Sequence, residues 1–233
     1  MRTLAAPDRP TVHAERALVT AILGGEYLPG ATLPAERELA TRLGVTRPTL
    51  REALQRLARD GWVTIQQGKP TLVNDFWREG GLGVLSALAH PANGLPLPPD
   101  FIPNLLEVRL HLAPAYTCAA VQRNPDAVAD LLAQAADLED APAAFAAYDW
   151  RLHHALTVAS GNPIYTLILN GFAGFYVQMA HRYFTRVEAR SASGAFYRDL
   201  RAAAQRGDNA AAEALTRQIM QHSIDLWQTA ADS

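Results

Sequence analysis

Arginine and lysine are concentrated in one stretch of a slightly acidic chain. From Arg37 to Lys69 there are seven basic residues against three acidic ones, a local balance of +4, whereas the 233-residue chain has a formal net charge of −2. A guanidinium group can bind a phosphate or a guanine edge through two hydrogen bonds. This stretch therefore predicts a polyanionic partner.

The pattern around these cations predicts a short helix that presents some of them at its first turn. Thr46 has the side chain of an N-cap residue, and Pro48 is tolerated just inside a helix. Apolar residues then recur at the spacing of one buried stripe: Leu50, Ala53, Leu54 and Leu57. Three side chains near the start of the helix must point away from that stripe, namely Arg47, Thr49 and Arg51.

Two further elements complete a winged helix-turn-helix. A shorter helix is expected from Pro34 to a C-cap at Gly44, and it carries Arg37. After the second helix, the β-branched runs 62–65 and 71–73 predict a hairpin, with Gln67, Gly68 and Lys69 at its tip. A purely structural helix pair with a charged, solvated face is the alternative. The complete order of elements favours DNA binding, since a recognition helix presents its N-terminal side chains to base edges.

The rest of the chain is expected to be helical. Glycines in the segment 74–83 predict a linker between a DNA-binding domain at 1–73 and an effector domain at 84–233. Asparagine, glycine and proline residues mark the expected helix ends. They place helices at about 103–123, 125–140, 142–160, 163–184, 192–206 and 208–230. The predicted fold class is mainly α, with a small β-hairpin in the first domain and an all-α antiparallel bundle in the second.

The composition and motif content indicate the expected cellular location and class of the protein. Cys118 is the only cysteine, so no internal disulfide can form, and a reducing cytoplasm is the expected location. The sequence has neither a signal-peptide pattern nor an apolar run of the roughly 18 residues that span a bilayer, so no membrane association is expected. An enzyme is not expected either, because no nucleophile elbow, phosphate loop or full metal-ligand set is found.

The residues LPAERELATRLGVTRPTLREALQRLARDGW resemble the winged helix-turn-helix of the GntR family of bacterial transcription regulators. The segments ARDGWVTIQQGKPTLVNDFW and SGNPIYTLILNG extend the resemblance to those members that regulate fatty-acid metabolism. It implies a homodimer on a palindromic double-stranded operator. It also implies that a helical effector domain binds long-chain acyl-CoA, which releases the DNA. Degradation genes would then be repressed, and synthesis genes activated, in the absence of that ligand.

The resemblance also implies particular DNA contacts. By position they fall on Arg37, Thr46, Arg47, Thr49 and Arg51, and in the minor groove on Gln67, Gly68 and Lys69. Two positions depart from the pattern of these relatives. Pro48 stands in place of a threonine and removes a hydroxyl and a backbone donor. Gln67 stands in place of a histidine and cannot become positively charged.

For the effector, the resemblance implies an acyl-CoA site lined by side chains from several helices: Leu106, Arg109, His153, Tyr176, Tyr183, Tyr197, Met220, Ser223 and Trp227. Core packing is the alternative for the aromatic residues, and an internal ion pair is the alternative for Arg109. His153 replaces an aromatic wall, Met220 replaces a glycine, and His222 replaces a glutamate. A methionine there could narrow the passage, although its flexibility allows it to move aside.

A metal-dependent site is the main competing interpretation of the effector domain. Asp149 and His153 are four residues apart and would share a helical face, as two ligands of a metal do. GntR relatives that respond to small organic acids use such a pair with two further histidines. The matching positions here are Tyr197 and Met220, so no bound metal is expected. A small-acid regulator stays the alternative function, and a metal hydrolase built on Asp149, His153 and His154 is a remoter one.

Overall fold

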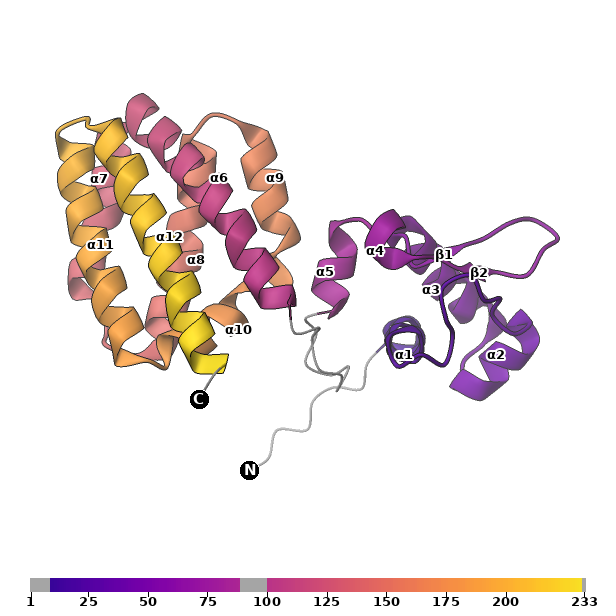
Figure 1. The fold of residues 1–233 in the computed structure, drawn as a ribbon. Helices are drawn as coiled ribbons and strands as arrows, with labels where there is room; N and C mark the ends of the chain where they lie inside the picture. The colour runs from indigo at the N-terminus through magenta and orange to yellow at the C-terminus, as the bar shows by residue number, and fades with distance from the viewer. Residues whose placement is uncertain (1–8, 89–99, 232–233) are drawn as a thin grey trace. The chain divides into compact units, whose positions relative to one another are not determined.

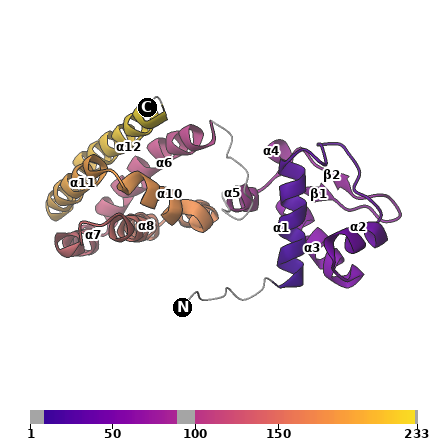
Figure 2. The same cartoon turned by 90° about the horizontal axis from the view of Figure 1, so that it is seen from below.

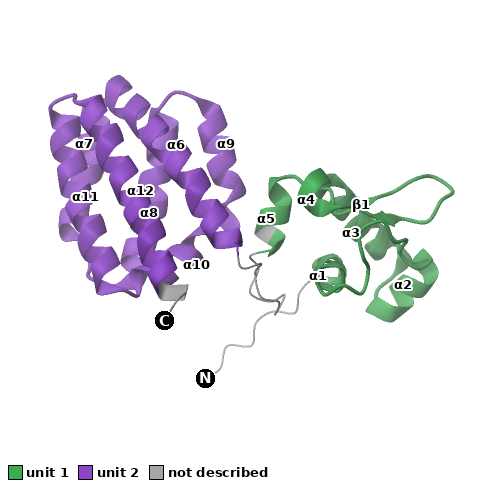
Figure 3. Cartoon of the chain, in the orientation of Figure 1, with its two compact units in different colours: residues 1–97 green, residues 98–233 purple. Residues whose placement is uncertain are grey.

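The computed structural model describes residues 9–88 and 100–231, arranged in two compact units. Residues 1–97 make up unit 1 and residues 98–233 make up unit 2 (Figure 3). Each unit has its own buried core, and each is described by itself below.

Unit 1 is a winged helix built on three helices, α1 (Pro10–Leu23), α2 (Glu36–Leu43) and α3 (Arg47–Asp60). The predicted caps are confirmed. The Thr46 hydroxyl accepts a hydrogen bond from the Thr49 backbone N–H at 3.3 Å, and Gly44 ends α2 with a φ of +66°. The stripe of α3 is buried as expected and packs against α1 and α2. Burying each leucine of this stripe contributes about 1.5–3 kcal/mol.

The wing is an antiparallel pair of short strands, β1 (Val63–Thr64) and β2 (Leu72–Val73). Val63 pairs with Val73, and Thr64 pairs with Leu72. The predicted hairpin is therefore confirmed, with shorter strands than the sequence suggested. Gly68 lies in the connecting loop with a φ of +73°, a conformation that glycine adopts without strain.

The segment 74–83, predicted to be the linker between the two domains, contains helical structure. It forms α4 (Phe76–Glu79) and the start of α5 (Leu82–Leu88), seen from below in Figure 2, and both helices belong to unit 1 (Figure 3). The Phe76 ring lies 4.8 Å from the ring of Trp62, centroid to centroid. The Gly81 backbone N–H donates to the Asp60 carbonyl at 3.2 Å. Here the glycines allow close packing against the end of α3, and this tertiary role is what the sequence pattern did not indicate.

Unit 2 is an all-helical bundle, which confirms the predicted fold class (Figure 1). Its helices are α6 (Phe101–Arg123), α7 (Pro125–Ala133), α8 (Pro142–Ala159), α9 (Pro163–Gly171), α10 (Ala173–Phe184), α11 (Val187–Gln205) and α12 (Asn209–Ala231), with a 3-10 turn at Gln134–Asp137. The helix predicted at 163–184 is broken at Phe172, between Gly171 and Gly174, where glycine weakens helix formation. The core centres on α8 and α11, with Leu152, Leu156 and Leu200 fully buried.

Candidate DNA interface and ligand cavity

All the predicted DNA-binding residues except the half-buried Thr49 are exposed on unit 1. Arg37, Arg47 and Lys69 lie on its surface, and within residues 9–88 and 100–231 none of them has an ion-pair partner. Cations that stabilise the fold would be expected to form ion pairs with acidic side chains. These three side chains can instead contact the phosphates or base edges of DNA.

A groove between α2, α3 and the wing brings part of the predicted set together. Arg51 from α3 and the wing residues Gln67, Gly68 and Lys69 all line it. Arg37, Thr46, Arg47 and Thr49 lie outside this groove, on and beside the first turns of α2 and α3. The Thr46 and Thr49 hydroxyls are 2.8 Å apart and hydrogen-bond to each other, so both take part in capping α3.

Glu36 is a member of this surface that the sequence analysis missed. Its carboxylate accepts a hydrogen bond from the Arg51 Nε at 2.7 Å, and it lines the same groove. The two residues are 15 apart in the chain, so helical spacing gave no sign of the pair. Because both side chains are solvent-exposed, the pair contributes only about 0–1 kcal/mol, and a phosphate could replace the carboxylate at small cost.

Unit 2 contains a cavity of about 60 Å³, lined by residues of α6, α8, α10, α11 and α12. All the predicted ligand residues except His153 and Tyr197 line it: Leu106, Arg109, Tyr176, Tyr183, Met220, Ser223 and Trp227. Apolar side chains that were not predicted complete the wall, among them Leu105, Phe196 and Ile219. Met220 is buried in this wall, on α12.

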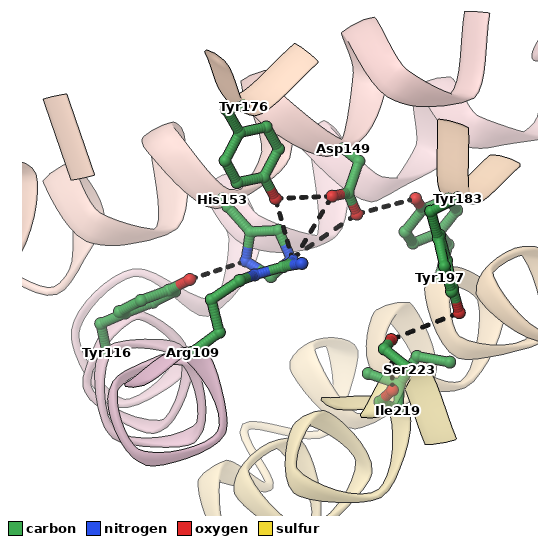
Figure 4. Close-up of polar contacts among 9 residues, drawn as sticks. All are labelled: Arg109, Tyr116, Asp149, His153, Tyr176, Tyr183, Tyr197, Ile219 and Ser223. Atoms are coloured by element: carbon green, nitrogen blue, oxygen red, sulfur yellow. Dashed lines mark hydrogen bonds and ion pairs between the residues drawn. The ribbon is translucent and has the colours of Figure 1, made fainter. Parts of the chain in front are cut away.

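A polar network centred on Asp149 interrupts the apolar lining, and Ser223 with Tyr183 makes a second, smaller polar contact there (Figure 4). The Tyr176 hydroxyl donates to Oδ2 of Asp149 at 2.6 Å, and the Tyr197 hydroxyl donates to Oδ1 at 3.2 Å. Arg109 donates to the Tyr176 oxygen at 2.9 Å and lies 3.6 Å from the carboxylate. Tyr197 does not line the cavity, and it contacts the cavity wall only through Asp149. Arg109 pairs with Asp149, which is the internal ion pair that was the alternative to ligand binding.

His153 is fully buried next to this network, and its Nδ1 lies 2.8 Å from the Tyr116 hydroxyl. Burial lowers the pKa of His153 to about 4, although the nearby Asp149 acts in the opposite direction. The ring is therefore neutral at pH 7, and the 3.6 Å approach of Nε2 to Asp149 is not an ion pair. Among the described residues Nε2 has no hydrogen-bond partner, and the tautomer of the ring decides whether Nδ1 or the Tyr116 hydroxyl is the donor.

The ionisation of the remaining groups follows from burial and charge. Burial raises the pKa of the Tyr176 and Tyr197 hydroxyls, so both stay protonated and can donate to Asp149. Burial by itself would lower the pKa of Arg109, but Tyr176 and Asp149 raise it overall. The network thus joins the partly exposed Arg109 guanidinium to the buried Asp149 side chain, directly and through the neutral Tyr176 hydroxyl.

The geometry does not assemble a metal site. Within the part of the chain that the structure describes, no group of three or more His, Cys, Asp or Glu side chains lies close enough together to hold a metal ion. Tyr197 donates a hydrogen bond to Asp149, and Met220 lines the apolar wall. Across the same residues, no helix is both long and apolar enough to cross a membrane.

Two family models together match nearly the whole chain. The model of bacterial regulatory proteins of the gntR family matches residues 10–73, and that of the FadR C-terminal domain matches residues 74–233. A "Fatty acid metabolism regulator protein" of Shewanella amazonensis is 43% identical over 225 residues, covering 96% of this chain and 92% of its own length. The protein of the same name from Shewanella oneidensis is 44% identical over 219 residues, covering 94% and 90%.

Solved structures agree at the level of the fold. The Listeria monocytogenes regulator Lar aligns with a TM-score of 0.62 at 18% identity, over 94% of this chain and 97% of its own. At that identity the match supports the architecture of the chain and not a particular ligand.

Proposed function

The chain belongs to the GntR family of bacterial transcription regulators, with a FadR-type C-terminal domain, and we propose that it regulates the transcription of fatty-acid metabolism genes. It is a DNA-binding regulator rather than an enzyme, as its family and its relatives indicate. A protein that reads the bacterial chromosome works in the cytoplasm, where we place it.

We propose that unit 1 binds one half of a palindromic double-stranded operator and that the protein acts as a homodimer. Two-fold symmetry places two equivalent wing-and-helix modules on two half-sites. The exposed and unpaired Arg37, Arg47 and Lys69 support this role for the described surface. Arg51 would exchange Glu36 for the DNA.

We further propose that unit 2 binds long-chain acyl-CoA and that the bound ligand favours release from the operator. The observation that carries this proposal is the largely apolar lining of the cavity, which suits an alkyl chain. Release would relieve repression of degradation genes and end activation of synthesis genes. By linkage, the ligand must weaken DNA binding by the same factor by which DNA weakens ligand binding.

A titration tests the ligand class directly. Fluorescence anisotropy of a labelled operator should fall when oleoyl-CoA is added, but not with citrate, lactate, or oleate plus free coenzyme A. Isothermal titration of the DNA-free protein should show heat with oleoyl-CoA at micromolar protein. If oleoyl-CoA changes neither the anisotropy nor the heat while the operator is still bound, acyl-CoA is not the ligand. The DNA-binding function would not be affected by that result.

A further inference from the structure

One acidic side chain lies in the groove between α2, α3 and the wing. Among the described residues that line this groove, Arg51 and Lys69 are the cations and Glu36 is the one acid. A carboxylate in such a place repels the phosphates of any duplex, and it also occupies a cation that would otherwise contact them. Glu36 therefore lowers the affinity of unit 1 for DNA, and its presence in the groove needs a reason.

The geometry joins Glu36 to a residue of the other helix. Glu36 is the first residue of α2, and Arg51 lies in the second turn of α3, which packs against α2 (Figure 1). One carboxylate oxygen accepts a hydrogen bond from the Arg51 Nε at 2.7 Å. The two side chains are 39% and 66% exposed, so DNA can reach both of them. Because water screens so exposed a pair, a phosphate or guanine held in a fixed position can displace the carboxylate.

Stabilisation of the helix is the alternative role of Glu36. A carboxylate in the first turn interacts favourably with the partial positive charge at a helix N-terminus. Glu38 lies in the same turn of α2, and it pairs with Arg42 at 2.8 Å outside the groove. Glu36 pairs instead with a residue that is predicted to contact DNA. The identity of the partner therefore distinguishes Glu36 from Glu38.

We propose that Glu36 is a specificity-determining residue, which competes with DNA for Arg51 and so weakens binding to non-operator DNA more than binding to the operator. This inference rests on the proposed function, because it presumes that unit 1 recognises an operator. On non-operator DNA no base contacts fix α3 in one register, and Arg51 stays with Glu36. On the operator those contacts fix α3, and Arg51 leaves Glu36 for a fixed partner on the DNA.

The salt dependence of binding separates these two states of Arg51. Non-operator binding comes almost wholly from phosphates that cations neutralise, and each such contact adds about 0.9 to the slope of log affinity against log salt. While Glu36 is present, Arg51 contributes to this slope only on the operator. Removal of the carboxylate leaves Arg51 able to contact phosphates on any duplex.

Glu36→Ala should therefore steepen the salt slope for non-operator DNA by about two units, about one for each protomer of the dimer, and leave the operator slope unchanged. At about 0.1 M salt the affinity for non-operator DNA should rise ten-fold or more. Fluorescence anisotropy would measure both slopes. The two probes are a duplex that the unaltered protein selects from a random pool and a scrambled duplex of the same length.

Glu38→Ala is the matched control. It also removes a carboxylate from the first turn of α2 and releases an arginine, but neither Glu38 nor Arg42 lines the groove. Both salt slopes should stay as they are in the unaltered protein. Glu36→Gln is a second test variant, which keeps an acceptor for the Arg51 Nε and removes the charge. It should steepen the non-operator slope in the same direction, so the inference does not depend on Glu36→Ala folding.

A double variant separates competition for Arg51 from simple repulsion of phosphates. In a chain that carries Arg51→Ala, adding Glu36→Ala should not change the non-operator slope further, because no guanidinium is left to release. The inference would be overturned by an unchanged non-operator slope in the folded Glu36 variants, by equal steepening on both duplexes, or by an effect that persists without Arg51. Each of these results leaves operator binding intact. If the unaltered protein selects no duplex over scrambled DNA, the proposed function fails and this inference fails with it.

Discussion

At the scale of single residues, the structure separates cations that serve the fold from cations left for a partner. Arg42 pairs with Glu38 along one face of α2, as i,i+4 neighbours on a helix do. Arg47 projects from the first turn of α3 without a described partner. The sequence predicted the exposed position of Arg47 correctly because a helical stripe fixes which residues point outward.

Arg47→Ala should weaken operator binding by about 1–3 kcal/mol, since it removes a contact to a base or a phosphate. A gel-shift titration would measure the change. Arg59→Ala is the control, because Arg59 lies at the opposite end of α3 and pairs with Asp60. Equal operator affinity in the Arg47 variant and the unaltered protein would remove Arg47 from the DNA-contacting set.

His153 should make the protein less stable in mild acid. Burial lowers the pKa of His153 from 6.5 to about 4 in the folded state, so the unfolded chain binds a proton more readily between these values. Stability is then complete above about pH 6.5 and falls as the pH is lowered towards 4, by up to about 3 kcal/mol.

Chemical denaturation at pH 7 and pH 5 would measure this dependence. His153→Phe should flatten the pH profile, whereas His154→Gln, on a neighbouring face of α8, should keep it. An unchanged slope in the phenylalanine variant would assign the acid sensitivity to other groups.

At the scale of elements, the sequence predicted correctly those features that depend on interactions between residues close together in the chain. Thr46 and Gly44 marked a helix start and a helix end because caps satisfy backbone groups within a few residues. The break at Phe172 and the docking of α4 were missed, since they depend on neighbours distant in sequence, such as Trp62 beside Phe76. In the cavity, Tyr197 was placed by resemblance, but only the structure showed that it acts through Asp149.

Gly61→Ala should disturb the junction between α3 and α4. Gly61 has a φ of +89°, and an added Cβ would lie 2.6 Å from the Glu79 carbonyl oxygen. Gly44→Ala is the matched control, because Gly44 also has a positive φ but has no atom within 4 Å of such a Cβ.

The control should lose about 1 kcal/mol from backbone strain alone. Gly61→Ala should lose clearly more, because backbone must also move. Thermal or denaturant unfolding would compare the two variants, and equal losses would show that the close approach of Glu79 is easily relieved.

At the scale of the whole molecule, charged residues have different roles in the two units. The stretch from Arg37 to Lys69 is basic within a chain of net charge −2, and it lies in unit 1. Unit 2 keeps Arg109 and Asp149 together inside. Unit 1 therefore presents cations on its surface for a polyanion, whereas in unit 2 Arg109 is paired with Asp149.

Operator affinity should fall steeply with salt, because each phosphate neutralised by a cation releases counterions. With several contacts on each half-site, we expect a loss on the order of a thousand-fold between 50 and 200 mM salt. Arg37→Ala should make the slope shallower by about two units on a double-logarithmic plot, about one for each protomer of the dimer. An affinity that does not change with salt would contradict electrostatic binding by this surface.

The cavity of unit 2 lies in a different unit from the DNA-binding residues, which has a consequence for how such regulators diversify. A single codon change at a wall residue such as Leu105 would change the ligand that unit 2 binds, while the operator sequence that unit 1 recognises would stay the same. Paralogues arising by gene duplication could thus acquire new inducers without losing their promoters, and a biosensor could be engineered by the same route.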